Sequence, residues 1–421
     1  MTDAIAFRDG TSRGRAVFAA RDLLPGDRLL VEAPLISMPI PESRTAILAC
    51  ERCCQPTGTI SSQLQHLCQK RQLPTLPIED DSLAGDEPCR RHCGARFCGV
   101  ACEAAAAPSH DFLCGGRSAA ADSAMRRFEE NALGSHEVFL FGARVVADIL
   151  ARAKAAGTAC AVAAAAYDPL CRVPWWDISD DGVAKTKSER LCVRREADVS
   201  RSLLLDALLV DASAAKAKAV REWLSLEEWG GLLGAARRNS ICVCKSHPVD
   251  EFVAALQEWS AEQTAGSARA VDGLLHALPT PIPDATWTAL YDRMSCVNHA
   301  CRPKYMPALS QSRDHAPCPH MAKARTMPPP PPAQLSSHPP TRSAEVHFLG
   351  EDHMATLIAT RAVAAGDEIF ISYIDHNERG RLEDRRASLR DYGFECDCDK
   401  CTAEESWRRR LRQRLEPRLH Y

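Results

Sequence analysis

Closely spaced cysteine pairs mark the first third of the chain as a metal-binding region. Within each pair the two residues are separated by only two or three others, so both can reach one ion from a single turn of backbone. Structural zinc sites usually have this form. The pairs are Cys50 and Cys53, Cys98 and Cys102, and His110 and Cys114.

Cys89 supplies one more thiolate in this block. The sequence leaves two candidates for the second ligand of this pair. His92 gives a two-residue gap and Cys93 a three-residue gap. Ligand type favours Cys93. Eight ligands would hold two tetrahedral zinc ions in closed sites, which have a structural role because no coordination position stays open. Buried cysteines without metal are the alternative interpretation.

Three further segments, far apart in the sequence, are candidates for a second site. The first contains Arg13 and Gly14 ahead of a strand-like run. The second reads Asn-His-Ala-Cys-Arg-Pro over 298–303. The third contains Ile-Ser-Tyr at 371–373 and, nineteen residues after that tyrosine, a tail motif in which three cysteines follow a Tyr-Gly-Phe sequence over 392–401. Each segment alone is a weak signal, but their order is specific.

Composition narrows the functional classes. The chain has 421 residues, 20 cysteines and a formal net charge of -3. A strongly basic footprint for bulk nucleic-acid binding is missing, and no specific nucleic-acid contact is expected. The sequence has no apolar run near the roughly 20 residues that span a bilayer, and we expect no membrane association. Because no secretory signal is recognisable, we expect a reducing compartment, where clustered cysteines more often bind metal than form disulfides.

Periodicity predicts the elements that must position these residues. Short strands are expected in 13–40, and helices in an alanine-rich stretch from about 119 to 240. Strand-like alternation returns after 345, and a basic helix is expected at the end of the chain. We expect inserted loops at 55–88, 247–285 and 307–340, the last of which contains a run of five prolines.

The cysteine block over 50–114 resembles the MYND zinc finger, with a longer gap than usual between Cys53 and Cys89. Together with the three segments, it is similar to the SET-and-MYND subfamily of SET-domain protein-lysine methyltransferases. The resemblance implies an α+β fold, a split SET-domain β-fold with an inserted MYND finger, a helical insert and a zinc-binding post-SET tail. The implied units are an N-terminal SET part at 1–49, the finger at 50–114, the helical insert at 115–235, the core SET part at 236–375, the post-SET segment at 376–405 and a basic tail at 406–421.

The resemblance also implies roles for individual residues. Tyr373 matches the catalytic tyrosine. A third zinc site is implied for Cys301, Cys396, Cys398 and Cys401. Contacts to S-adenosylmethionine are implied for Arg13, Gly14, Asn239, Ser295, Asn298, His299 and Phe394, the last of which would pack on the adenine.

On this basis the chain is expected to methylate a lysine of a histone or non-histone protein, in the nucleus or the cytoplasm, with S-adenosylmethionine and three zinc ions, two of them in the finger. The alternative is a catalytically weak or inactive scaffold whose finger binds proline-containing peptides. Lys304, where the family usually has Asn, and the long loops favour the scaffold. Asn298, His299, Tyr373 and the complete set of tail cysteines favour the enzyme.

Overall fold

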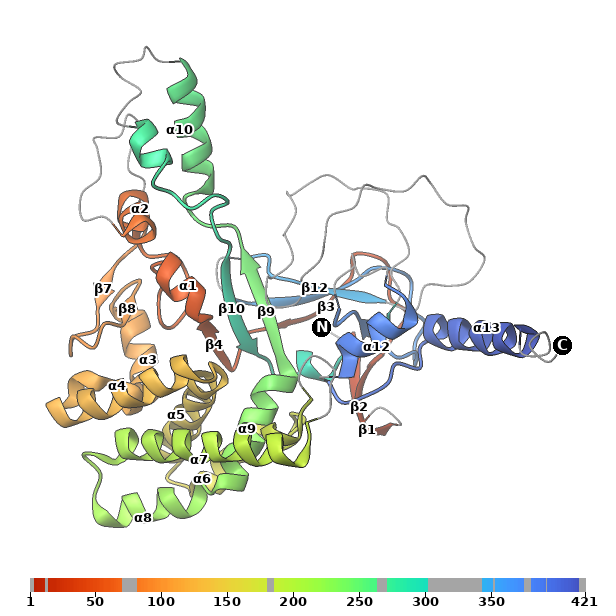
Figure 1. Cartoon of the computed structure of the whole chain (residues 1–421), viewed down its shortest axis with the longest axis horizontal. Helices are drawn as coiled ribbons and strands as arrows, with labels where there is room; N and C mark the ends of the chain where they lie inside the picture. The colour runs from red at the N-terminus through yellow and green to blue at the C-terminus, as the bar shows by residue number, and fades with distance from the viewer. Residues whose placement is uncertain are drawn as a thin grey trace.

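The computed structural model describes residues 4–11, 14–69, 82–179, 185–262, 271–301, 343–350, 353–374, 380–390 and 392–415. Arg13, Lys304 and the expected insertion at 307–340 lie outside these ranges. The described chain is a mixed α and β structure in which a β region lies beside a group of helices (Figure 1). Helix α13 (Asp399–Leu415) extends away from both.

Strands from the two ends of the chain pair with one another in the β region. In one antiparallel sheet, of order β12-β13-β3, the central strand β13 pairs with β12 on one side and with the N-terminal strand β3 on the other. In a second the order is β4-β10-β9. The strands are β1 (Ile5–Thr11), β2 (Gly14–Ala19), β3 (Arg28–Glu32), β4 (Ile36–Pro39), β9 (Ser240–Lys245), β10 (Ala285–Leu290), β11 (Asn298–His299), β12 (Ala344–His347), β13 (Ala355–Ala359) and β14 (Phe370–Ile371).

Short β11 and β14 run parallel, and this pairing positions the candidate site. Asn298 lies opposite Phe370 and His299 opposite Ile371. The two segments are far apart in the sequence, but the ladder places His299 directly beside the residues that lead into Tyr373.

The cysteine block combines strands of two or three residues with two helices, and it has only a small apolar core, as expected where metal ligands stabilise a unit. Its elements are β5 (Gly58–Thr59), α2 (Ile60–Cys68), β6 (Ser82–Ala84), β7 (Glu87–Pro88), β8 (Arg96–Phe97) and α3 (Val100–Leu113), preceded by α1 (Pro41–Ala46). The expected loop at 55–88 is wrong over 60–68. There Thr59 caps α2 through a reciprocal bond pair with Ser62, which closes the first turn of the helix.

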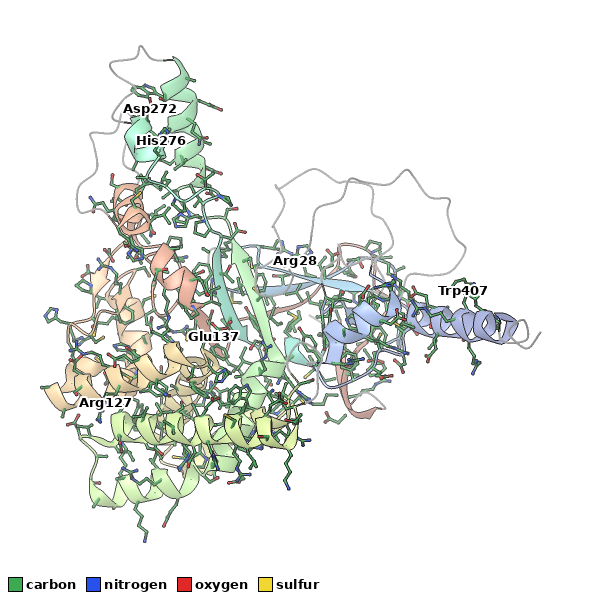
Figure 2. The ribbon with its side chains drawn as sticks, in the orientation of Figure 1. Arg28, Arg127, Glu137, Asp272, His276 and Trp407 are labelled. Atoms are coloured by element: carbon green, nitrogen blue, oxygen red, sulfur yellow. The ribbon has the colours of Figure 1, made fainter. Side chains whose placement is uncertain are left out.

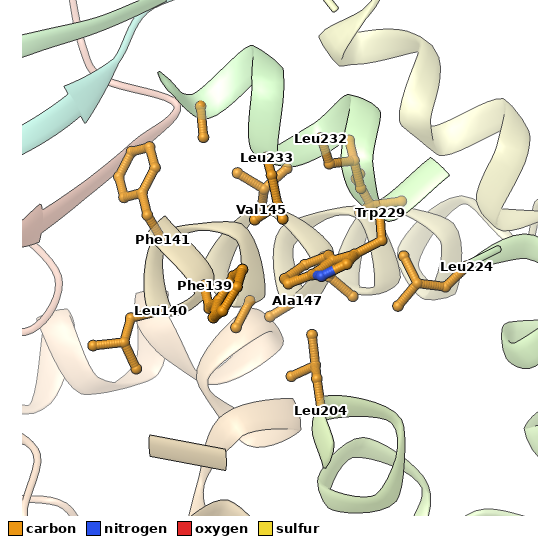
Figure 3. Close-up of a cluster of buried hydrophobic side chains, with 14 of the residues drawn as sticks. Phe139, Leu140, Phe141, Val145, Ala147, Leu204, Leu224, Trp229, Leu232 and Leu233 are labelled. Carbon is orange, nitrogen blue, oxygen red and sulfur yellow. The ribbon is translucent and has the colours of Figure 1, made fainter. Parts of the chain in front are cut away.

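The alanine-rich stretch is helical, as predicted. Its helices are α4 (Ala119–Gly134), α5 (Val138–Ala156), α6 (Cys160–Ala163), α7 (Lys187–Leu209), α8 (Ala214–Trp223) and α9 (Leu226–Asn239). Helix α5 is central, and its Phe139 packs with Leu204 and Trp229 in the core shown in Figure 3. Gly142 permits this packing, because a Cβ there would lie 2.6 Å from Leu233. Trp175 and Trp176, which lie between α6 and α7 in the sequence, are buried in the same core.

The expected loop at 247–285 is also wrong, since it contains α10 (Asp250–Glu262). Phe252, Val253 and Leu256 form an apolar face there, and it packs on Val271 and on Leu64 of α2 in a small separate core. Asp272, labelled in Figure 2 together with His276, accepts a hydrogen bond from Ser260 Oγ at 2.7 Å and closes this unit. The helical spacing of those apolar residues was the overlooked signal.

Two helices follow the β region. Helix α12 (Leu382–Arg390) packs against the start of α13, which continues without a break through the expected boundary at 405. Trp407 is an exposed aromatic residue on α13 (Figure 2). Among the described residues no single helix is long and apolar enough to cross a bilayer; α5 passes that test only jointly with 160–167, at a bend of 111°.

Candidate functional site

The structure gathers all the predicted metal ligands into three groups of four. Within each group the ligand atoms lie within 4.8 Å of one another. The groups are Cys50, Cys53, Cys98 and Cys102; Cys89, Cys93, His110 and Cys114; and Cys301, Cys396, Cys398 and Cys401.

The finger pairs its ligands alternately along the chain, the first pair with the third and the second with the fourth. Cys53 Sγ lies 3.6 Å from Cys98 Sγ, and Cys89 Sγ lies 4.0 Å from Cys114 Sγ. This crossed arrangement ties the two ends of the block together, so either ion would constrain most of the finger.

The geometry favours Cys93 over His92 as the ligand that accompanies Cys89 in the second finger group. Cys93 Sγ lies 3.5 Å from His110 Nε2. His92 is exposed, has a positive φ of 54°, and belongs to neither finger group. The two residues are neighbours in the sequence, but the turn points only one of them inward.

The donor chemistry fits zinc. Burial raises the pKa of Cys93 and of Cys114, and burial lowers the pKa of His110. Closely packed thiols with raised pKa values form thiolates together only when a cation balances their charge. Three sulfurs with one imidazole nitrogen, or four sulfurs, are the usual donor sets of structural zinc.

The third group joins the Asn-His segment to the tail. Cys301 Sγ lies 3.5 Å from Cys396 Sγ and 3.6 Å from Cys401 Sγ. All four cysteines are buried. The guanidinium of Arg385 is buried beside them, and its Nη2 donates to Cys401 Sγ at 3.5 Å. A divalent ion with four thiolates carries net negative charge, which this guanidinium would offset.

A cavity of about 340 Å³ lies next to this group. Its wall is formed by the end of α9, strand β9, the turn before β11, strand β12 and the segment after β14. Three of the predicted site residues line it, namely Asn239, Ser295 and Tyr373. An apolar pocket with a few convergent polar groups is the usual form of a small-molecule site.

Tyr373 is held on the cavity wall by both ends of the residue. Its hydroxyl donates to the carbonyl oxygen of Val297 at 2.7 Å, and its backbone N–H donates to His299 Nδ1 at 2.9 Å. Burial raises the pKa of Tyr373 well above its ordinary value, so the hydroxyl stays protonated.

His299 connects Tyr373 to the third cysteine group. Because Nδ1 accepts the Tyr373 N–H, the proton of the neutral ring belongs on Nε2, which lies 3.1 Å from Cys301 Sγ. Burial lowers the pKa of His299 to about 4, which favours this neutral form. One side chain therefore bridges a metal ligand and the residue predicted to be catalytic.

Two of the predicted cofactor residues are held by hydrogen bonds within the chain. Asn298 donates to the Arg15 carbonyl at 3.0 Å and to Glu368 at 2.8 Å. The Asn239 side chain forms hydrogen bonds with the backbone of Cys171 and of Ala235, and so joins the segment at Cys171 to the end of α9. Their contacts to a cofactor stay predictions, as does that of Arg13, which lies outside the described residues.

Phe394 and Gly14 complete the predicted set. The Phe394 ring centroid lies 6.0 Å from that of His299 and 6.2 Å from that of Tyr373. Gly14 begins β2 with a φ of +83°, a conformation that side chains rarely adopt. Their roles toward a cofactor also stay predictions.

Sequence reasoning assigned no role to several cavity residues. The Tyr392 ring lies 4.9 Å from that of Tyr373 and lines the cavity, and its place in the tail motif was an available signal. Ser240 and Cys242 also line it, from strand β9, which follows Asn239 directly. Their position beside a predicted cofactor residue could have indicated them.

Two long matches among known proteins are to lysine methyltransferases. The chain is 24% identical over 335 residues to the histone-lysine N-methyltransferase ATXR2 of Arabidopsis thaliana, which covers 74% of this chain and 61% of the plant protein. It is 22% identical over 422 residues to the protein-lysine N-trimethyltransferase SMYD5 of Gallus gallus, which covers 94% of this chain and 84% of that protein. No protein-family model matches the chain.

A shorter match is closer in sequence. Over 60 residues, which are 14% of this chain and 17% of the other, the identity to a SET and MYND domain-containing protein of Dictyostelium discoideum is 43%. All three relatives are thus named as lysine methyltransferases or by these two domains. The chain is therefore similar to two proteins named as lysine methyltransferases and, over a short stretch, to one named for its SET and MYND domains.

Proposed function

We propose that the chain is an S-adenosylmethionine-dependent protein-lysine N-methyltransferase with a split SET-domain core, in which the cavity beside Tyr373 is the active site. One observation carries this proposal. The hydroxyl and the backbone of Tyr373 are both fixed on the wall of a cavity of about 340 Å³, by Val297 and His299, within reach of the third cysteine group.

The cofactor would supply a methyl group on a sulfonium sulfur. A lysine amine can displace that sulfur directly, and the protein then needs to align the reactants rather than provide a nucleophile. The fixed hydroxyl of Tyr373 would orient the methyl group, with the Val297 carbonyl holding the ring in place. The apolar cavity wall, including Tyr392, would favour the neutral form of the entering lysine, because burial disfavours its charge.

Three zinc ions would have a structural role, two in the finger and one in the third group. The substrate would be a lysine in a histone or another protein, in the nucleus or the cytoplasm. The similarity to two relatives named as lysine methyltransferases supports the substrate class.

The test is transfer of radiolabelled methyl groups from S-adenosylmethionine to proteins of a cell extract, with Tyr373→Phe as the matched variant. We expect labelled protein with the natural chain and at least about 100-fold less with the variant, since loss of alignment costs on that order. Cofactor binding without any transfer would contradict the proposal. It would favour the scaffold alternative, which a binding assay with proline-containing peptides would then examine.

A further inference from the structure

Two cysteines outside the metal groups lie in contact at the cavity wall. Cys242 Sγ and Cys244 Sγ are 3.2 Å apart on strand β9. Their side chains occupy one face of the strand, because Val243 between them points into the core. Cys242 lines the cavity, and Thr286 Oγ1 donates to Cys244 Sγ at 3.7 Å from the neighbouring strand.

We propose that Cys242 and Cys244 form a reversible disulfide that closes the cofactor cavity under oxidation. The regulatory part of this proposal rests on the proposed function, and the formation of the disulfide does not. The oxidant is a peroxide of hydrogen-peroxide size, which can enter through the cavity.

The chemistry balances with one peroxide. The Cys242 thiolate attacks one peroxide oxygen, the O–O bond breaks, and the products are a sulfenic acid and hydroxide. The Cys244 thiol then attacks the Cys242 sulfur, the S–S bond forms, and the sulfenic oxygen leaves as water after taking a proton. In total two thiols and one hydrogen peroxide give one disulfide and two water molecules.

The strand permits this bond and also makes it easy to reduce. Residues two apart on a strand have Cα atoms about 6.6 Å apart, near the upper limit of roughly 6.8 Å for disulfides. The bond therefore forms only if β9 contracts locally. Such contraction is feasible because β9 is the edge strand of the β4-β10-β9 sheet that the described residues form. Strained disulfides are the more readily reduced ones, which makes the change reversible.

Contraction of β9 would reach the cavity directly. The cavity wall includes the unbroken run from Arg238 to Cys242, at the end of α9 and the start of β9. Ser295 Oγ on the opposite segment lies 3.4 Å from the Asn239 carbonyl. A shift of this wall narrows the space in which the cofactor is proposed to bind.

Peptide mapping of the full-length, zinc-loaded chain tests bond formation. After one equivalent of hydrogen peroxide and alkylation, trypsin releases residues 239–245, which lie between Arg238 and the cleavage after Lys245. We expect this peptide to carry an internal disulfide and no alkyl group, while the zinc content stays constant. Alkylation of both cysteines, further oxidation of Cys242 to a sulfinic acid, or loss of zinc before the bond forms would each overturn the proposal.

Cofactor binding tests the consequence. We expect peroxide to weaken S-adenosylmethionine binding at least tenfold, and dithiothreitol alone to restore it. Cys244→Ser removes the partner thiol but no cavity-lining residue. The affinity of this variant for S-adenosylmethionine should therefore be the same before and after peroxide. Cys192→Ser, at an exposed cysteine on α7, should respond like the natural chain. A disulfide with unchanged affinity would refute the regulatory role.

Hydrogen exchange separates this inference from the proposed function. If the reduced chain does not bind the cofactor, the proposed function fails, but exchange of the peptides that contain Ser295 and Tyr373 still reports on the cavity. We expect peroxide to change their exchange in the natural chain and not in Cys244→Ser. Equal exchange before and after oxidation would overturn the proposal.

Discussion

The finger and the third cysteine group use the same donor chemistry in different surroundings. Each finger group is attached to the rest of the molecule through the polypeptide around it. Glu51, between the first two ligands, pairs with Arg144 on α5 at 2.5 Å. The third group contacts the candidate active site directly, through His299 and the backbone of Tyr373.

This difference separates two roles for similar metal sites. The spacing of ligands shows that a metal can bind, but the surroundings determine what depends on it. Metal in the finger should stabilise a unit docked on the helices. Metal in the third group should hold the cavity wall itself, because Cys301 follows His299 by two residues on one segment.

Removal of one ligand from each region should have the most unequal effect. We expect Cys401→Ser to lose one zinc and to weaken S-adenosylmethionine binding at least about 100-fold, since structural zinc carries much of the folding energy of its segment. Cys102→Ser should also lose zinc but change that affinity less than about threefold. Elemental analysis and titration calorimetry measure both quantities. Equal losses of affinity would remove the distinction between the regions.

Tyr373→Phe should separate chemistry from binding at the third group. We expect the rate of methyl transfer to fall about 100-fold, while the dissociation constant of the cofactor and the zinc content stay unchanged. The ring still fills its place, and only the bond to the Val297 carbonyl is lost. Single-turnover transfer and calorimetry are the measurements. A large fall in affinity would indicate that the hydroxyl supports the cavity rather than the reaction.

Two replacements of His299 should separate its contact with Tyr373 from its contact with Cys301. In His299→Asn the amide oxygen can still accept from the Tyr373 N–H, whereas in His299→Gln the amide nitrogen can still donate toward Cys301. We expect the Gln variant to bind zinc about tenfold more tightly than the Asn variant, and the Asn variant to bind the cofactor about tenfold more tightly than the Gln variant. Effects of this size are common when a group that orients a metal ligand is altered. Identical behaviour of the two variants would argue against a bridge.

The link between finger and helices should affect stability alone. Arg144→Met leaves Glu51 without its partner and should lower the free energy of unfolding by about 3 kcal/mol, with cofactor affinity unchanged. Arg152→Met removes a more exposed ion pair with Asp148 on the same helix, and we expect less than about 1 kcal/mol. Urea unfolding compares them. Weaker cofactor binding in Arg144→Met would contradict the separation.

Acid should release metal from both regions, which lowers stability on its own. The contribution of the β region to the pH dependence of stability therefore needs a separate variant, at His353. His353 contacts Ser37 and Trp287, and burial lowers its pKa from 6.5 to about 3. The unfolded chain then binds a proton below pH 6.5 that the folded chain does not. This stability is complete above pH 6.5 and decreases as the pH falls toward 3.

At pH 5 the loss from His353 should be about 2 kcal/mol. His353→Gln has no such proton, so its unfolding free energy should fall by that much less between pH 7.5 and pH 5. Parallel pH profiles for the two proteins would show that the acid response comes from the metal groups.

Local chemistry made part of the site predictable. Cys98 lies just before α3 and Cys102 lies in its first turn, and this four-residue interval places their sulfurs 3.3 Å apart. The helices of 119–239 and the strands of 14–39 likewise follow from periodicity. Tyr373 could be identified because its motif keeps a fixed order relative to the tail cysteines.

Other features depended on contacts that no short pattern contains. The apolar face of α10 packs in part on Leu64, which comes nearly two hundred residues earlier. Cys93 and His92 are adjacent and chemically competent, and a left-handed turn decided between them. The hydrogen bonds between the Asn239 side chain and Cys171 also could not be predicted from the sequence.

By itself, the sequence determined which atoms could bind metal and which tyrosine could take part in transfer, because those properties belong to residue types at short spacing. Only the tertiary structure decided which ligand pairs lie together, that His299 joins a predicted metal ligand to Tyr373, and that Cys242 lines the same cavity as Tyr373. The physical reason is that the chain segments involved are brought together by burial and by strand pairing between its two ends. Neither has a local signature.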